Sequence, residues 1–360
     1  MRFVDSSRKE FIDHLKHFVH PSEEISIPAQ LVGREDELGK LRDCFETNGA
    51  HAFVWGLRGV GKTSLVHTAC AKYSDTVKLA AAVGCQKRST YQELLKDIYR
   101  RATNSGIVNL NDSSIKGKLS LFGVMTLEGE KGGFREQLQI DSVNHASDFL
   151  NTILPKDLYT DQEWVIIVNE FDQLENQETI NFFTSLAKQM SVDKVNVKFV
   201  FCGVASNLND LIGSHESVDR YIKAVDLEPL NHTYTLRIAE NIFQEFDVEP
   251  SRGQMFRISQ IASGYPHFVH LIVGEILKEC YETSFHMRSI GADIYKSSIK
   301  RAARGAATRL QKEYENATRK GTDRYIEVLW AAADGQLLVK QFKSIRSGWS
   351  SPTEVVLRYV

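Results

Sequence analysis

The chain has 360 residues, 42% of them hydrophobic and 25% charged, and a net charge of −2. These values suit a globular protein of two or three domains and exclude a general polyanion binder. No stretch reaches the roughly 18 consecutive apolar residues that cross a bilayer, and the N-terminus has no signal-peptide run. We therefore expect a cytoplasmic protein with no membrane partner. The five cysteines lack metal-ligand spacing and lie in apolar surroundings, which predicts buried, reduced thiols.

Residues 1–30 predict an N-terminal helix followed by an extended leader. Phe11, Leu15 and Phe18 share one face of that helix. From residue 31, apolar runs typical of strands alternate with helical patterns. The apolar runs are His51–Trp55, Thr76–Val83, Trp164–Val168, Val195–Cys202 and Tyr221–Leu227. Such alternation predicts an α/β fold, a mostly parallel sheet with helices on both faces.

Residues 105–141 interrupt the alternation, and we interpret them as an inserted hairpin or loop. After about residue 230 the strand signal ends and helical patterns take over, which places a domain boundary near Glu228-Pro229-Leu230. The expected domains are the N-terminal helix and leader (1–30), a strand–helix domain (31–229), an all-helical domain (230–285) and a basic helical C-terminal segment (286–360).

A phosphate-binding loop follows the first predicted strand. Residues 56–63, Gly-Leu-Arg-Gly-Val-Gly-Lys-Thr, match G-x-x-x-x-G-K-[ST] and run from that strand into a predicted helix. Glycines let the backbone N–H groups wrap a phosphate, and the helix N-terminus adds its positive end. Lys62 would bridge the outer phosphates, and Thr63 would offer a hydroxyl to Mg²⁺. The residues expected to hold the phosphates are Gly56, Gly59, Val60, Gly61, Lys62, Thr63 and Ser64.

The strand Trp164–Val168 ends in polar residues, at the edge where open α/β sheets bind ligands. Phosphate-binding loops of this kind need an acidic strand end that holds the metal's water shell. Asn169 stands where an aspartate usually lies, so we expect it beside the metal with Thr63, but with weaker metal binding and slow hydrolysis. Glu170 is the expected general base, and Asp172 would replace part of the missing charge.

A family resemblance begins upstream of this loop. Residues 31–38, Leu-Val-Gly-Arg-Glu-Asp-Glu-Leu, are similar to the h-h-G-R-E-x-E-L box of STAND and origin-recognition-type initiator ATPases. The chain thus resembles an AAA+/STAND-type P-loop ATPase over about residues 30–285. The resemblance implies that ATP or ADP binds with Mg²⁺, and that Val32, Gly33 and Arg34 lie near the adenine and ribose.

The resemblance also implies residues near the outermost phosphate. Residues 197–207 resemble the sensor-1 strand, whose polar residue would be Ser206 or Asn207. Arg220 lies where the class often carries an arginine finger, which would reach a neighbour's ATP or its own. With Glu170, Arg220 completes the expected catalytic set.

A helical lid is implied by residues 262–266, Ala-Ser-Gly-Tyr-Pro, which look like the G-x-P element at the start of a lid helix. Pro266 would then lie at the nucleotide, and proline suits a first helical turn. His267 and His270 occupy the region where other AAA+ proteins carry a sensor-2 arginine.

The C-terminal segment is basic. Residues 296–346 hold 12 Lys/Arg against 5 Asp/Glu, a local charge of +7. In relatives a winged helix begins near a pattern like that of residues 324–331, but only 36 residues follow position 324 here. We therefore expect a short, incomplete winged-helix-like segment.

The resemblance implies an ATP-binding switch or motor, a weak ATP hydrolase that forms homo-oligomers with nucleotide and regulates protein partners in a larger complex. One alternative is a DNA-associated ATPase, an initiator, loader or regulator of transposition or antiviral defence, which the basic segment favours. Another is a degenerate nucleotide-binding scaffold for protein interaction, which Asn169 favours. A small-molecule kinase fits less well, because the sequence indicates no second substrate pocket.

Overall fold

The computed structural model describes residues 7–21, 24–108, 113–123, 138–156, 161–204, 220–283 and 289–318. The chain divides into two compact units, residues 1–295 and 296–360. In the described ranges, no helix is long and apolar enough to cross a membrane. All five cysteines are buried free thiols, as their apolar surroundings predict.

The centre of the first unit is a parallel sheet of five strands, in the order β2-β3-β4-β1-β5. The strands are β1 (His51–Gly56), β2 (Val77–Gly84), β3 (Glu163–Asn169), β4 (Val197–Gly203) and β5 (Ile222–Leu227). The predicted parallel sheet is therefore confirmed. Because β4 lies between β1 and β3, the carboxyl ends of these three strands meet at one edge of the sheet.

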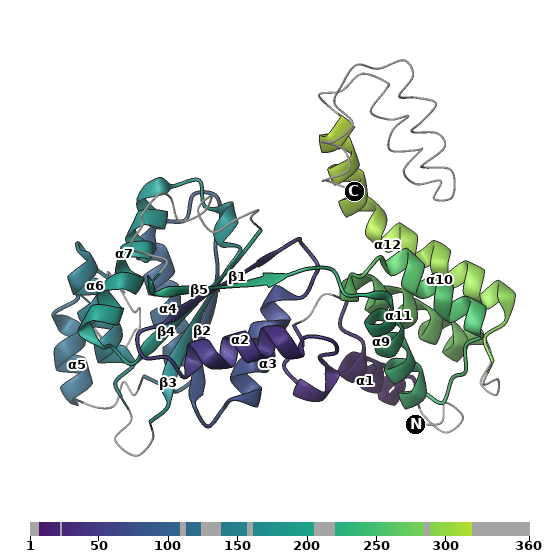
Figure 1. Ribbon diagram of the computed structural model, residues 1–360, viewed down its shortest axis with the longest axis horizontal. Helices are drawn as coiled ribbons and strands as arrows, with labels where there is room; N and C mark the ends of the chain where they lie inside the picture. Colours follow the sequence, from purple (N-terminus) through teal and green to yellow (C-terminus); the bar gives the residue numbers. More distant parts are fainter. Residues whose placement is uncertain are drawn as a thin grey trace, which may run out of the picture. The chain divides into compact units, whose positions relative to one another are not determined.

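Helices cover both faces of this sheet (Figure 1). One face carries α2 (Glu35–Phe45) and α3 (Lys62–Lys72); the other carries α4 (Tyr91–Asn104), α5 (Ser113–Ser120), α6 (Val143–Ile153) and α7 (Gln177–Asp193). Alternate side chains of β3 supply both cores: Val165 and Ile167 pack toward α2 and α3, while Ile166 and Val168 pack toward the other helices. A strand buried on both faces reads as a continuous apolar run.

Helix α5 corrects the hairpin or loop expected within residues 105–141. Ile115, Leu119 and Phe122 recur at helical spacing, and Leu119 and Phe122 are buried in the core that α4 and α6 share. The glycine at 117 lowers intrinsic helix propensity by about 1 kcal/mol, which hid this periodicity. Burial of the apolar face outweighs that cost. Residues 124–137 lie outside the described ranges.

The helical part after β5 consists of α9 (His232–Glu245), α10 (Arg252–Ala262) and α11 (Pro266–Thr283), called the lid here. Helix α1 (Arg8–Phe18) joins it, because the Phe11 ring stacks on Tyr281 with centroids 4.2 Å apart and meets Phe246 edge-on at 6.1 Å. Short 3-10 turns lie at Pro28–Gln30 (η2) and Phe171–Gln173 (η3).

A long helix, α12 (Ala292–Thr318), begins in the first unit and continues into the second. The winged-helix-like segment expected near residues 324–331 lies outside the described residues.

The leader, residues 19–27, connects the lid to α3. At one end the His20 N–H donates to His270 Nδ1 at 3.3 Å, and the carbonyl of Pro21 is hydrogen-bonded to His267 Nδ1. At the other end the Ile25 N–H donates to Ser64 Oγ at 3.1 Å, and Thr68 Oγ1 donates to the Ile25 carbonyl at 3.1 Å. The leader is thus fixed to both parts of the unit.

His51 ties β1 to its neighbours as a neutral ring. Its Nδ1 accepts from the Phe199 N–H at 2.9 Å, and its Nε2 donates to the Ala187 carbonyl at 2.8 Å. Burial lowers the pKa of His51 to about 4. A protonated ring would set a second N–H against the Phe199 N–H, which opposes protonation in the folded state.

We expect the free energy of unfolding to fall as pH decreases below about 6.5, where an unfolded histidine takes up its proton. The folded pKa of His51 lies below that value, so the stabilisation is complete above pH 6.5 and is lost on acidification toward pH 4. The loss between pH 6.5 and 5 is about 2 kcal/mol for this histidine. Urea unfolding at several pH values checks it: His51→Gln should show a shallower slope, and equal slopes would contradict the assignment.

Candidate functional site

The loop between β1 and α3 has the backbone of an anion site. Gly59 and Gly61 have φ of +90° and +98°, which L side chains rarely adopt. Gly56 has no room for a side chain, because a Cβ there would lie 2.3 Å from the Leu227 carbonyl oxygen. Gly61 occupies the N-cap position of α3 and offers no side-chain acceptor. The first N–H groups of α3 therefore remain available for an anion.

Lys62 is held against this loop. Its Nζ donates to the carbonyls of Gly56 at 2.9 Å and Leu57 at 3.0 Å. Burial lowers the pKa of Lys62, and the nearby carboxylates of Asp172 and Glu170 oppose that shift. Phosphate oxygens are stronger acceptors for an ammonium group than neutral carbonyls, so the amine suits an incoming phosphate.

The two residues expected at the metal are brought together. Thr63, in the first turn of α3, donates its hydroxyl to Asn169 Oδ1 at 3.0 Å, and Asn169 is the last residue of β3. Both side chains present neutral oxygens. Mg²⁺ takes oxygen ligands and keeps several waters, so this pair fits the metal but gives it no protein charge.

Glu170 and Asp172 follow Asn169 and point to different partners. Glu170 has a left-handed backbone, φ +56°, and its Oε1 lies 3.5 Å from Nη2 of Arg58 in the loop. Asp172 Oδ1 accepts from the Val204 N–H at 2.9 Å, which fixes it at the end of β4. Asp172 is therefore a second carboxylate at the same edge of the sheet, but it is held by β4.

Arg34 of the G-R-E box is buried and joins three segments. Its Nη2 donates to the carbonyl of Val60 at 3.1 Å and to that of Glu228 at 2.8 Å, and its Nη1 pairs with Glu37 at 2.9 Å. The guanidinium thus connects the loop to the chain between β5 and the lid. All of these contacts are internal to the protein.

Gly33 lies under a lid residue. Its φ is +70°, and a Cβ there would lie 2.3 Å from Cγ of Tyr234, in the first turn of α9. Tyr265 reaches the loop in a similar way, since a Cβ on Gly59 would lie 3.6 Å from its ring. The lid therefore contacts both the G-R-E box and the phosphate-binding loop.

A cavity of about 200 Å³ lies where the end of α1 and the turn η2 meet α9. Its walls include Val32 from the box, Ile238 and Ile242 from α9, and His270 from α11. Burial lowers the pKa of His270 to about 3, so this ring is neutral. Pro266 opens α11 and is partly buried.

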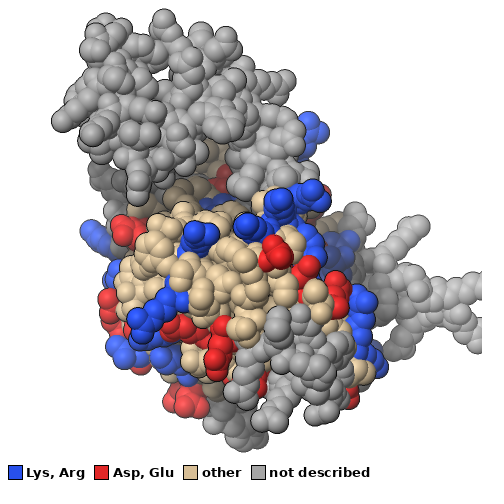
Figure 2. Space-filling model, turned by 90° about the vertical axis from the view of Figure 1, so that its right-hand side faces the viewer, with Lys and Arg blue, Asp and Glu red and all other residues tan. Residues whose placement is uncertain are grey.

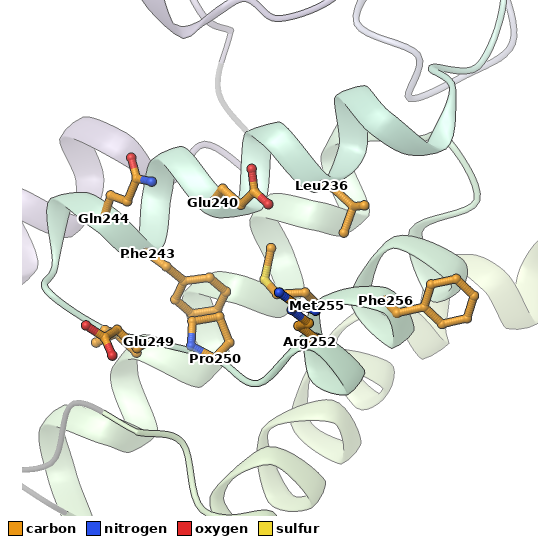
Figure 3. Close-up of a pocket in the computed structure, with 10 residues that line it drawn as sticks. Leu236, Glu240, Phe243, Gln244, Glu249, Pro250, Arg252, Met255 and Phe256 are labelled. Atoms are coloured by element: carbon orange, nitrogen blue, oxygen red, sulfur yellow. The ribbon is translucent and has the colours of Figure 1, made fainter.

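The opposite side of α9 borders a larger groove of about 460 Å³ (Figure 3). Phe243 and Met255 extend into the space between α9 and α10, and Leu236 and Phe256 add apolar surface. The loop that would bind phosphate contributes no residue to this groove. Helix α9 therefore separates an apolar groove from the cavity beside Val32.

The structure does not bring Arg220 to this site. Arg220 is exposed and precedes β5, at the amino edge of the sheet, whereas the phosphate loop lies at the carboxyl edge. A strand of this length spans roughly 17 Å, so Arg220 does not reach its own chain's loop. Asn207, with Ser206, lies outside the described residues.

Some contacts had no sequence signal. Ser64 was expected at a phosphate, and its hydroxyl accepts from the Ile25 N–H instead, which leaves its backbone N–H for that role. Arg58 was only a variable position of the loop motif. Tyr234 belongs to no motif, and its place over Gly33 depends on how the lid folds back.

Comparison with known proteins agrees with this geometry. Residues 30–200 match the AAA ATPase domain family. No curated protein matches the chain. The Walker-type ATPase PABY2304 of Pyrococcus abyssi is 17% identical, with a TM-score of 0.56 over 94% of this chain and 90% of that one. The Orc1 protein of Aeropyrum pernix, solved with DNA, is 14% identical, with a TM-score of 0.51 over 90% of this chain and 80% of that one. At such identities the likeness is one of fold.

Proposed function

We propose that the chain is an ATP-binding switch whose lid responds to the nucleotide, and the match of residues 30–200 to the AAA ATPase domain family supports this proposal. The observation that carries the proposal is the phosphate loop itself, with its left-handed glycines, the uncapped start of α3 and the Thr63–Asn169 contact beside it. These features together suit a nucleotide phosphate chain with a hard metal ion.

The phosphates would lie in the loop, held by the N–H groups of residues 59–64 and by the amine of Lys62. The adenine would lie toward Val32 and Pro266. Val32 also lines the 200 Å³ cavity, whose walls combine apolar side chains with polar ones such as Gln30 and Asn241. Gly33 and Arg34 would lie near the adenine and ribose. Arg34 would have a structural role there, because its side chain already bonds two protein carbonyls and Glu37.

Thr63 and Asn169 would hold Mg²⁺ and its waters. The metal would neutralise charge on the outer phosphates when bound. Glu170 would accept a proton from an attacking water, and its position after Asn169 at the same edge of the sheet supports this role. Since Asn169 brings no charge, we expect turnover to be slow and ADP to be the product.

The contacts of the lid suggest how a bound nucleotide would change the position of the lid. Tyr234 covers Gly33 and Tyr265 approaches Gly59, so the lid touches the box and the loop where the nucleotide would enter. A nucleotide that binds one lid position better than another shifts the population of lid positions. A switch of this kind needs differential affinity and not fast turnover. Other copies of the chain and protein partners would then bind the lid surface according to the position of the lid.

We expect the purified chain to bind ATP and ADP in a Mg²⁺-dependent manner and to gain mass with ATP but not with ADP. Calorimetric titration measures the binding, and light scattering on the same samples measures the mass. Binding without a change in mass would remove the proposed self-assembly and retain a monomeric switch. If neither nucleotide bound, the P-loop would be only a scaffold and the proposal would be wrong.

A DNA-associated ATPase is the second candidate, because Lys296, Lys300 and Arg304 recur every four residues on α12 and are exposed. On the face that Figure 2 shows, however, Lys and Arg side chains are interspersed with Asp and Glu over the described surface. Fluorescence anisotropy with duplex DNA at low and high salt separates the candidates. Salt-dependent binding would favour this one, and no binding at low salt would exclude it.

A further inference from the structure

Arg58 and Glu170 form an ion pair at the mouth of the candidate site. Nη2 of Arg58 lies 3.5 Å from Oε1 of Glu170, and the two side chains are 63% and 56% exposed. An ion pair this exposed contributes little to stability. The pair does, however, join the phosphate loop to the candidate general base.

The backbone at the end of β3 sets this arrangement. Asn169 turns toward Thr63, at the α3 end of the loop, and Glu170 turns toward Arg58, at the other end. Glu170 adopts a left-handed backbone, φ +56°, and its carbonyl accepts from the Gln173 N–H at 2.8 Å. The turn η3 therefore fixes the backbone of Glu170. Asn169, the last residue of β3, and Glu170, which follows it, contact two different parts of the same loop.

Among the cations in or beside this loop, Arg58 is held more weakly by other protein groups than Lys62 and Arg34 are. Lys62 donates to two carbonyls of the loop, and Arg34 is buried with its own partners. The guanidinium of Arg58 is exposed, and a planar fork of this kind binds phosphate oxygens in a bidentate manner. A triphosphate in the loop would place a second and more highly charged anion beside it.

We propose that Arg58 binds the outermost phosphate of ATP and thereby releases the carboxylate of Glu170. Without a triphosphate, Arg58 pairs with Glu170 and occupies the carboxylate. With ATP, Arg58 moves to the γ-phosphate, and the freed carboxylate of Glu170 faces the water. This inference rests on the proposed ATP binding, and it adds a residue that distinguishes ATP from ADP.

Competition between two anions for one cation has a measurable signature. Loss of Arg58 removes a contact that only ATP makes, so affinity for a triphosphate should fall while affinity for ADP stays the same. Loss of the Glu170 charge removes the competitor, so affinity for a triphosphate should rise, but only while Arg58 is present. The two effects are therefore non-additive.

The experiment titrates a non-hydrolysable ATP analogue and ADP, each with Mg²⁺, into wild type, Arg58→Gln, Glu170→Gln and the double variant. Arg58→Gln should weaken the analogue roughly 10-fold, the scale of an exposed charge-assisted hydrogen bond, and change ADP by less than about 2-fold. Glu170→Gln should tighten the analogue a few-fold, and the double variant should match Arg58→Gln. Lys87→Gln, which breaks the similarly exposed Lys87–Glu175 pair, should match wild type.

Equal losses for the analogue and ADP in Arg58→Gln would overturn the inference, because Arg58 would then shape the loop and not sense the third phosphate. Unchanged affinities in Arg58→Gln would overturn it too, as would an additive double variant. Failure of the proposed function looks different, since wild type would then bind neither nucleotide. Arg58→Lys keeps the charge without the fork and should fall between wild type and Arg58→Gln.

Discussion

Replacement of Lys62 by alanine is expected to weaken ATP binding roughly 10- to 100-fold, the range for lost hydrogen bonds to a charged group. In the structure Nζ of Lys62 bonds only to the carbonyls of Gly56 and Leu57, among the described residues. Both acceptors belong to the loop, so the amine is already placed where phosphates would lie. Turnover should fall further, by roughly 100- to 1000-fold, because charge develops on the transferred group.

The matched control is Lys72→Ala, at the other end of the same helix. Lys72 is exposed and lies 5.8 Å from the Tyr73 ring centroid, away from the loop. Calorimetry with ATP and a phosphate-release assay should separate the two variants, while their melting temperatures without nucleotide should agree closely. Wild-type affinity and turnover in Lys62→Ala would show that the loop holds no phosphate.

Restoring a charge by Asn169→Asp is expected to raise the affinity for Mg²⁺ in the presence of nucleotide by roughly 10- to 100-fold, the scale for groups that hold a metal's ligand shell. The side chain of Asn169 accepts from the Thr63 hydroxyl at 3.0 Å, and an aspartate keeps an acceptor oxygen at that place. The substitution adds a negative charge and replaces the amide N–H₂ donor by a second acceptor oxygen. Turnover at low Mg²⁺ should therefore rise more than turnover at saturating Mg²⁺.

A titration of turnover against Mg²⁺ concentration measures this shift. Asn181→Asp, an exposed position on α7, adds the same charge away from the loop and should leave the titration unchanged. If Asn169→Asp alters neither metal dependence nor turnover, the weak site is not caused by the missing charge. The chain would then be better explained as a nucleotide-binding scaffold.

Most of the sheet could be predicted from the sequence because its three central strands, β3, β4 and β1, are buried on both faces. Residues 164–168 and 199–202 are continuous apolar runs, which are typical of buried strands. Helix α5 could not be predicted in this way. Its apolar face is short and contains Gly117, so its stability depends on a core that only the folded chain supplies.

The phosphate loop was predictable because its chemistry requires particular residues at adjacent positions. Contacts between distant segments were not. Tyr234 over Gly33 joins residues about two hundred positions apart, and no local pattern records it. The pairing of Arg58 with Glu170 depends on the left-handed turn at Glu170, a conformation that residues with side chains rarely adopt and sequence patterns do not report.

The leader makes the lid a body attached in two places. One attachment is the chain after β5, where the Leu230 N–H bonds the Gly264 carbonyl at 2.8 Å. The other is the leader, which bonds α11 through His20 and α3 through Ile25. A rigid body held at one point keeps three rotational degrees of freedom, whereas one held at two points keeps a single axis through them. Any lid movement that preserves both attachments is a swing about that axis.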